Sequence, residues 1–393
     1  MPYIKQSFIK QQLGGHSDEL WFLSLVFNDG YMVTSNMPAN FKPANISAPG
    51  LAVIPELEGL NLDEDLLKTA EEIVITQASA LRSFPLLLSA AILKALAHYQ
   101  KKPLYVLLQE IAGNNDPKLP TPIITYFYGA ASGETDLDFS EYLLLPGAKN
   151  ARSVKEKILT MAGLNGKISE LLSKNGYEAS WGRSGAWSAS LNSSIAAFNL
   201  LEAAVIDGGW TLGADYQLGV AVGAGQLYNK KTGKYHFGGD QLLSGVDLLS
   251  VFSDWHHQHH IGYLEDACDG ADQHGADNLY AELGGKMLLS ANRTLAGDEA
   301  WLRNSLSKRY FNCVSIELSD FAKWSQLLEF VQVARKHNLA IVLVDQSANN
   351  QDVWLSDLAV ALNFDFVRFG SLFGLERTQK YNRLCTIEEE LAS

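Results

Sequence analysis

The 393-residue chain has few cysteines and too little positive charge for a polyanionic partner. Its three cysteines, Cys268, Cys313 and Cys385, are odd in number and far apart, so they form neither a disulfide framework nor a CxxC metal pattern. The formal net charge is −13, whereas nucleic acid and anionic membranes are bound by basic surfaces. We therefore expect neither as a partner.

The sequence also lacks long hydrophobic runs. No apolar run is long enough to cross a bilayer, and the first residues, MPYIKQSFIKQQLGG, lack the apolar core of a signal peptide. Hydrophobic residues make up 47% and charged residues 19%, which is ordinary for a soluble globular protein. We expect a cytoplasmic location, and the length suits two domains.

The first third of the chain mixes strand and helix patterns. The apolar segments 21–27 and 31–35 flank Asn28-Asp29-Gly30, which predicts a hairpin with an Asp-Gly turn. Helical periodicity follows at 63–77, 84–99 and 103–112. The segment NNDPKLPTP is dense in turn formers and prolines, which predicts a domain boundary. We expect an α+β domain over residues 1–118 and a second domain over 119–393.

Eight short apolar runs then alternate with helical segments. The runs are 122–128, 141–146, 218–225, 261–266, 286–292, 312–318, 339–345 and 365–370, and helical segments include 194–205, 245–256, 298–307, 321–337 and 352–362. Continuous apolar runs are typical of strands buried on both faces, and intervening helices indicate parallel crossovers. An open doubly wound sheet is the alternative, but its Gly-rich phosphate fingerprint is absent after the first strand. We predict an α/β fold in which the second domain is a closed β/α barrel of the TIM type.

Several of these runs end in polar residues. They are Glu265-Asp266, Asn292, Glu317, Asp345 and Arg368. In a β/α barrel the carboxyl ends of the strands meet at one mouth, where the chemistry of such proteins takes place. We therefore expect these side chains to converge, and their charges suit a metal or an amine ligand.

Three segments carry a family resemblance. The segment 233–272 contains a helical stretch and then IGYLEDACDGAD, similar to a strand ending in Ile-Glu-Asp-Pro and an acidic loop. The C-terminal ERTQKYNRLCTIEEEL is close to Ser-Glu-Arg-X-X-Lys-Tyr-Asn-Gln-Leu-X-Arg-Ile-Glu-Glu-Glu-Leu, and 101–122 is similar to Gly-X-Pro-Leu-Tyr…Leu-Ala-Gly-Asn…Leu-Pro-X-Pro. These patterns resemble those of enolases. The resemblance implies a small α+β domain followed by an α/β barrel, and commonly a homodimer.

Enolases interconvert 2-phosphoglycerate and phosphoenolpyruvate with a lysine base and two Mg²⁺ ions that stabilise the enolate. The resemblance places the three carboxylates of the first metal at Ala221, Glu265 and Asn292, so that only Glu265 is retained. One carboxylate, one amide and one methyl make a poor Mg²⁺ site, because a hard dication needs several charged oxygens. We therefore expect no cofactor, and Mg²⁺ only if the site functions nonetheless.

The other catalytic positions implied by the resemblance are also changed. The lysine base falls on Glu317, and a second lysine falls on Arg368. The histidine of a Ser-His-Arg-Ser stretch falls on Asp345, whereas Ser347 of that stretch and a carboxylate, Glu141, are retained. A carboxylate in place of the lysine ammonium would repel the anionic substrate, so we interpret Glu317 as a polar strand end rather than as the base.

Three other motifs suggest sites. The cluster HHQHH places His256 and His260 one helical turn apart, which could hold Zn²⁺ with a third ligand, but it precedes a strand and we interpret it as a solvated helix end. In GVAVGAG the glycines lack dinucleotide-loop spacing and indicate close packing. The stretch SWGRSGAW could bind a ligand through Trp181 and Trp187.

Three functions remain open. The first is a degenerate enolase homologue that lacks dehydratase activity and binds a small molecule or a protein partner. The second is an enzyme with altered chemistry in a remodelled barrel mouth. The third is a divergent but active enolase, a lyase, which requires that simultaneous loss of the base and most metal ligands be harmless. Each such loss typically costs several kcal/mol of transition-state stabilisation, so we favour the first.

Overall fold

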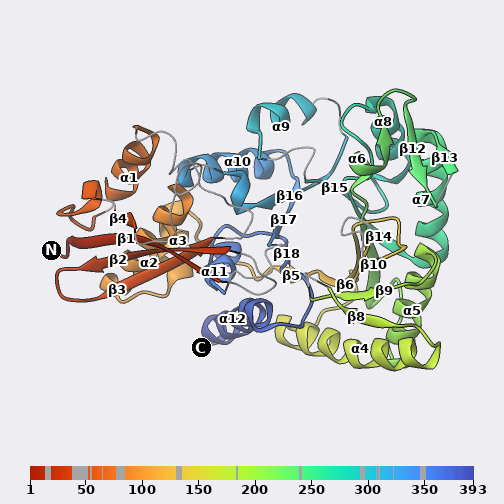
Figure 1. The fold of residues 1–393 in the computed structure, drawn as a ribbon, viewed down its shortest axis with the longest axis horizontal. Coiled ribbons are helices and arrows are strands. Elements are labelled where there is room, and N and C mark those ends of the chain that lie inside the picture. The colour runs from red at the N-terminus through yellow and green to blue at the C-terminus, as the bar shows by residue number, and fades with distance from the viewer. Residues whose placement is uncertain are drawn as a thin grey trace.

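The computed structural model describes residues 1–13, 19–37, 52–53, 55–63, 65–76, 85–129, 135–182, 185–238, 241–292, 297–306, 308, 310–321, 323–345 and 351–393. An N-terminal sheet with three helices lies at the left of Figure 1, and a curled sheet surrounded by helices fills the rest. Within the described residues, no helix is long and apolar enough to cross a membrane.

The N-terminal sheet is antiparallel, with the strand order β3-β2-β1-β4. Its strands are β1 (Ile4–Leu13), β2 (Glu19–Phe27), β3 (Met32–Met37) and β4 (Ala52–Val53). The predicted hairpin is confirmed: Gly30 has a φ of +88°, a value that glycine adopts without steric cost, and the amide of Tyr31 donates to Oδ1 of Asp29. The sequence analysis did not predict β1.

Three predicted helices accompany this sheet, after a short 3₁₀ turn, η2 (Pro55–Leu57). They are α1 (Asp65–Thr76), α2 (Pro85–Gln100) and α3 (Leu104–Ala112). Helix α2 packs on β2 and β3, and α3 ends at Gly113 in the left-handed conformation. An ion pair between Lys94 and Asp352, and a 2.8 Å bond from the Asn114 amide to the Ala361 carbonyl, join this part to the barrel.

All eight apolar runs of the second part are strands, as predicted. They are β5 (Thr121–Pro122) with β6 (Ile124–Tyr128), β7 (Glu141–Pro146), β10 (Tyr216–Ala221), β14 (Ile261–Glu265), β15 (Leu288–Ala291), β16 (Cys313–Glu317), β17 (Ala340–Val344) and β18 (Phe366–Arg368). β5 pairs with β18 while β6 pairs with β7, and Ile123 joins β5 to β6, so the sheet closes into a barrel.

One strand runs against the prediction of parallel crossovers. β7 is antiparallel to both β6 and β10, whereas the pairs from β10 through β14, β15, β16 and β17 to β18 are all parallel. A parallel partner needs a crossover of a dozen or more residues, usually a helix. The described residues between β6 and β7 contain no helix, so the chain returns in the opposite direction. The first residue of β7 consequently lies at the same end as the last residues of the parallel strands.

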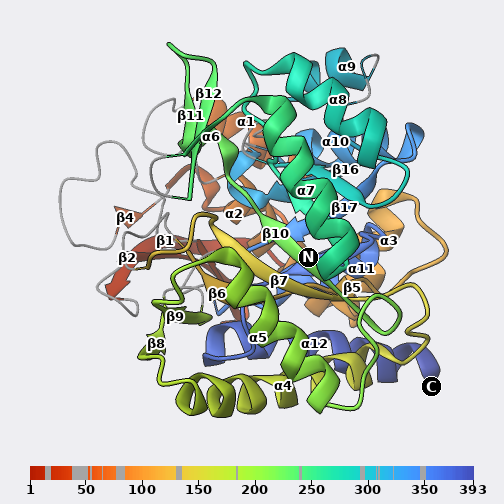
Figure 2. The ribbon, with the colours of Figure 1, turned by 90° about the vertical axis from the view of Figure 1, so that its right-hand side faces the viewer.

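Helices cover the outside of the barrel. They are α4 (Val154–Lys174), α5 (Ser194–Asp207), α7 (Gly245–His259), α8 (Gln273–Leu283), α9 (Glu299–Leu306), α10 (Trp324–Lys336), α11 (Trp354–Ala361) and α12 (Leu375–Ala392). Figure 2 shows α5 and α7 in front of β7 and β10. Capping boxes at Ser153 and Ser244 fix the starts of α4 and α7. The sequence analysis did not predict α4.

Several short elements escaped prediction because they contain only two to four residues each. The hairpin β8 (Ala179–Trp181) and β9 (Trp187–Ala189) extends the barrel sheet beyond β6. A separate small sheet contains β11 (Tyr228–Asn229), β12 (Lys234–Phe237) and β13 (Gln241–Leu243), and follows the short helix α6 (Ala224–Leu227). A single 3₁₀ turn, η4 (Leu318–Asp320), follows β16.

The apolar core is divided by the barrel wall. A large cluster fills the space between strands and helices, and a second cluster lies inside the barrel. The second cluster contains Ile123, Leu143, Leu145, Ala221, Tyr263, Cys313, Val342 and Val344. Because side chains alternate along a strand, the inward-facing residue that follows Tyr263 is Glu265, and those that follow Cys313 are Ser315 and Glu317. The barrel interior therefore changes from apolar to polar toward the carboxyl ends of the parallel strands. We call this end of the barrel the barrel mouth.

Candidate functional site

Three neighbouring strands place their mouth-end residues in one row. Ala221 of β10 is the Cα partner of Glu141 on one side and of Glu265 on the other. Glu141 reaches this row only because β7 is antiparallel, so its first residue lies at the mouth. The two glutamates that the sequence analysis singled out therefore flank the methyl group of Ala221.

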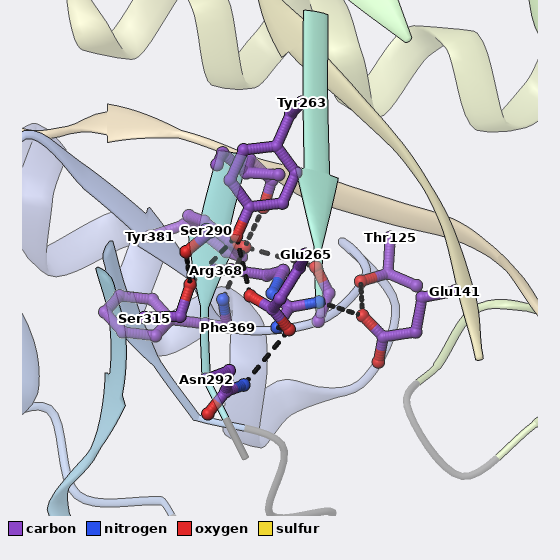
Figure 3. Close-up of polar contacts among 12 residues, drawn as sticks. Thr125, Glu141, Tyr263, Glu265, Ser290, Asn292, Ser315, Arg368, Phe369 and Tyr381 are labelled. Carbon is purple, nitrogen blue, oxygen red and sulfur yellow. Dashed lines mark hydrogen bonds and ion pairs between the residues drawn. The ribbon is translucent and has the colours of Figure 1, made fainter. Parts of the chain in front are cut away.

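Arg368 enters this row from β18, on the opposite side of the interior, and bridges the two glutamates. Its Nη1 lies 2.7 Å from Oε2 of Glu141, and its Nη2 lies 2.5 Å from Oε1 of Glu265. The three residues are only 1%, 3% and 3% exposed, in the order Arg368, Glu141 and Glu265. Figure 3 shows the guanidinium between the two carboxylates. The two ion pairs are thus shielded from water.

Neutral side chains complete the surroundings of the two carboxylates (Figure 3). The Asn292 amide donates to Oε1 of Glu265 at 3.0 Å, and the Tyr263 hydroxyl donates to Oε2 at 2.6 Å. The Thr125 hydroxyl donates to Oε2 of Glu141 at 3.2 Å. The Tyr263 hydroxyl also contacts Ser315, whose hydroxyl in turn contacts that of Ser290. We call Thr125, Glu141, Tyr263, Glu265, Ser290, Asn292, Ser315 and Arg368 the mouth network.

Electrostatics stabilise the ionised forms of this network. Burial alone would raise the pKa of Glu265, but the charge of Arg368 and the surrounding hydrogen-bond donors outweigh it and hold that pKa below its usual value. Burial likewise tends to lower the pKa of Arg368, but the charges of Glu265 and Glu141 outweigh it and raise that pKa. The Tyr263 hydroxyl stays protonated, because burial and then the charge of Glu265 raise its pKa well above the ordinary value.

Asp345 takes part in a second buried ion pair. Its Oδ2 lies 2.5 Å from Nζ of Lys380, which is 0% exposed and belongs to α12. The hydrogen bonds and ion pairs of Arg368 go to Glu141 and Glu265, so Asp345 does not join the mouth network through that arginine. The acid at the end of β17 is neutralised from the helix side.

Glu317 is also outside the mouth network. It is partly exposed, its amide donates to Oδ2 of Asp320 at 3.1 Å, and its Oε2 lies 3.5 Å from the Ser319 hydroxyl. These contacts belong to the turn η4 that begins directly after β16. They agree with the interpretation of Glu317 as a polar strand end.

The predicted site residues therefore separate into groups. The structure brings together Glu141, Glu265, Asn292 and Arg368, but leaves Asp345 with Lys380 and Glu317 with η4. Ser347 lies outside the described residues.

The sequence analysis did not name the neutral members of the mouth network or Lys380. Strand alternation could have found Tyr263, which lies two residues before Glu265 and so faces the same side. The same reasoning applies to Ser315, two residues before Glu317. Lys380 is the lysine of the C-terminal pattern quoted for the family resemblance, but nothing in that pattern points to Asp345 as its partner.

The histidine cluster agrees only in part with the expectation of a solvated helix end, since His257 and His260 are exposed but His259 is not. His259 is buried, and its Nδ1 lies 2.8 Å from Oε1 of Glu202. His260 lies beyond α7 with a φ of +52°, so it is not one helical turn above His256, whose Nδ1 contacts the Ile261 carbonyl at 2.8 Å. These histidines therefore lie at the junction of α7 and β14 and make structural contacts there. The described residues contain no cluster of three or more potential His, Cys, Asp or Glu metal ligands.

The structure also shows the packing of the two other motifs, GVAVGAG and SWGRSGAW. Gly219 of GVAVGAG packs closely, since a Cβ there would lie 3.2 Å from Cβ of Tyr263 and 3.3 Å from Cβ of Leu143. Trp181 stacks on Trp187, with ring centroids 3.8 Å apart, and on Phe373 at 3.9 Å. The two tryptophans thus pack on each other across the β8–β9 hairpin.

The mouth network does not fit Mg²⁺. A hard dication takes about six oxygen ligands, several of them charged. Both oxygens of Glu265 already accept hydrogen bonds, a guanidinium lies between the carboxylates, and Ala221 offers a methyl group where a third oxygen would be needed. Arg368 therefore supplies the positive charge that the two glutamates require.

Residues 116–393 match the family model described as "Enolase, C-terminal TIM barrel domain". The chain belongs to the enolase family. It is 28% identical over 343 residues to an enolase of Bdellovibrio bacteriovorus, an alignment that covers 86% of this chain and 79% of that protein. The whole mouth network lies within the matched enolase barrel, and the family confirms the α/β barrel fold expected from the sequence.

Proposed function

We propose that this enolase-family protein does not dehydrate 2-phosphoglycerate and acts by binding a small molecule or a protein. The observation that carries the proposal is the ion bridge from Arg368 to Glu141 and Glu265. These residues satisfy one another inside the barrel, where the enolase resemblance implies a metal ligand and substrate-binding groups. A buried, paired network resists rearrangement, because separating its charges leaves an uncompensated ion.

The charge of the mouth supports the same proposal. Glu141, Glu265 and Arg368 carry a formal charge of −1 together, and Glu317 ends strand β16, two strands away from both β14 and β18. A substrate with a carboxylate and a phosphate would meet the net negative charge of the ion bridge there. At about 5 Å and an effective dielectric of about 20, each like-charge contact costs on the order of 3 kcal/mol before screening.

The chemistry of proton abstraction is also unsupported. The resemblance implies a lysine base at Glu317, whose carboxylate is shorter than a lysine side chain and contacts the turn η4. The same resemblance implies Mg²⁺ ligands at Ala221 and Asn292. Loss of a single charge-stabilising group typically costs about 10²–10³-fold in rate, so combined loss would leave no measurable enolase turnover.

Turnover of 2-phosphoglycerate with excess Mg²⁺, followed through phosphoenolpyruvate absorbance, tests the proposal. An authentic enolase at equal concentration is the positive control, and the Arg368→Met variant shows whether residual activity comes from contamination. We expect no turnover above that variant. Steady turnover by wild type that Arg368→Met abolishes would overturn the proposal and favour a divergent active enolase.

Two further proposals rest on the family resemblance: two domains, over residues 1–118 and 119–393, and a homodimer, as is common among enolases. We also propose a cytoplasmic location. We propose no nucleic-acid partner, because the net charge is −13.

A further inference from the structure

A cavity lies outside the barrel interior, between strands β14 and β15 and helices α8 and α9. Its volume is about 200 Å³. Leu264 of β14 and Leu289 of β15 line the cavity. Each is next in sequence to a residue of the mouth network, Tyr263 or Ser290, so the two leucines face the opposite side of the sheet. Although residue Ser290 also lines the cavity, its hydroxyl contacts Ser315 in the mouth network, and the ion pairs of Arg368 lie on the other face of the sheet.

Aromatic and aliphatic side chains form the walls of this cavity. The rings of Trp301 and Phe311 are nearly parallel, at 12°, with centroids 5.9 Å apart. Leu264, Leu279 and Leu289, all buried, complete the apolar lining. An apolar cavity of about 150 Å³ holds a benzene molecule, so this one has room for a single ring with a short side chain.

The polar lining is predominantly acidic. Asp266, Asp269 and Asp272 line the cavity, whereas Lys308 is the one cationic side chain among the lining residues that the structure describes. Within the part of the chain that the structure describes, no ion pair joins Asp269 or Asp272 to a lysine or arginine. Lys308 instead donates to Oε1 of Gln273 at 3.2 Å.

The backbone holds these carboxylates in place. Oδ1 of Asp269 accepts the amide of Ala271, and Oδ1 of Asp272 accepts that of Gly275 at the start of α8. Their negative field also reaches the Cys268 thiol in the lining, whose pKa is raised to about 12 by burial and then by the charges of Asp272 and Asp269. The fixed acids therefore favour a cation beside the aromatic wall.

We infer that this cavity binds a small organic cation, namely a primary alkylammonium whose short chain carries a single aromatic ring. The ring would lie against Trp301 and Phe311, and the ammonium would face Asp269 and Asp272. A cation near an indole face also gains from the ring quadrupole. This inference rests on the proposed binding role of the protein and names the class of small molecule that it would bind. The site is separate from the ion bridge of Arg368.

Calorimetric titration of the full chain with phenethylamine tests the inference. Its neutral analogue 2-phenylethanol has almost the same shape and so isolates the charge, and 3-phenylpropanoate places an anion on the same ring and two-carbon chain. We expect the amine to bind about tenfold more tightly than the alcohol, and the anion not to bind. Equal affinity for amine and alcohol, or no saturable amine binding, would overturn the inference.

Two variants locate the binding. Asp269→Asn keeps the acceptor for Ala271 but removes the charge, and should weaken amine binding about fivefold. Asp277→Asn, an exposed change of the same kind on α8, is the matched control and should leave it unchanged. Ala276→Leu, which fills the cavity, should abolish binding while circular dichroism shows an intact fold. Binding that survives both cavity variants would place the amine elsewhere and refute the site.

These titrations do not depend on turnover. If the protein proved to be an active enolase and still bound the amine selectively, the proposed function would fail and the cavity site would stand. If neither turnover nor amine binding occurred, the cavity inference alone would fail.

Discussion

Arg368 and Glu265 form an ion pair across the interior of the barrel rather than between neighbouring strands. Nη2 of Arg368 on β18 lies 2.5 Å from Oε1 of Glu265 on β14, and three strands separate them in the sheet. The pair therefore connects opposite walls at the mouth. Because Arg368 also pairs with Glu141 on β7, one side chain links three strands.

We predict that Arg368→Met destabilises the protein by about 3–5 kcal/mol, because it leaves two buried carboxylates without their cation. Urea unfolding measures the loss. The matched control is Arg303→Gln, which removes a partly exposed pair with Glu299 and should cost at most about 1 kcal/mol. Similar costs for the two variants would mean that the buried bridge contributes no more than a surface pair.

We predict that the contribution of Glu265 to stability disappears in acid. Its pKa is below the ordinary value of 4.5 in the folded state, so the unfolded chain takes up the proton first as the pH falls. The stabilisation is complete above about pH 4.5 and is lost as the pH falls through the lower folded pKa. Unfolding free energies of wild type and Glu265→Gln should differ most near neutral pH and converge in acid. Parallel curves from pH 7 to 3 would contradict the assigned shift.

The sequence predicted this pair only in part. Strand-end position was enough to bring Glu265, Asn292 and Arg368 to one mouth, because a β/α barrel gathers the ends of its strands. Nothing local showed that Arg368 would reach Glu265 and Glu141 rather than Asp345. The partner of Arg368 depends on which inward-facing residues lie at the same height along the barrel axis. It also depends on Lys380, a residue of α12 that lies 35 positions after Asp345 in the sequence and pairs with it.

The direction of β7 shows a related limit. Its apolar run predicted a buried strand correctly, but apolar content carries no information about direction. The connection does carry such information: the described residues between β6 and β7 contain no helix, whereas a crossover to a parallel strand usually contains one. That consideration would have placed Glu141 at the mouth from the fold alone, independently of the family resemblance. The short strands β8 and β9 had too few residues to show periodicity.

We predict that Lys380→Met is strongly destabilising, by about 3–5 kcal/mol, because it removes the cation that faces the buried Asp345. The double variant Asp345→Asn with Lys380→Met should recover part of the loss, since contacting residues are not additive. Thermal unfolding of the two single variants and the double variant gives the coupling. Strict additivity would show that the two side chains act independently.

We predict that the fold does not depend on a bound divalent metal. The carboxylates at the mouth are occupied by Arg368, and burial of the apolar strands supplies stability at about 25 cal/mol per Å². Excess chelator should leave the midpoint of thermal unfolding unchanged. A fall of many degrees that Mg²⁺ or Zn²⁺ reverses would reveal a structural ion.

The most direct test of the account is calorimetric titration with 2-phosphoglycerate, with and without Mg²⁺, on wild type and on Glu317→Lys. The account holds that Arg368, Glu141 and Glu265 close the mouth as an internal ion network and that its negative charge excludes an anionic phosphoester. It predicts no saturable binding to the wild type at millimolar concentrations under either condition. Binding that appears in Glu317→Lys alone would assign the exclusion to that charge. Millimolar or tighter binding by the wild type would contradict the account, because it would show that the mouth accepts the enolase substrate.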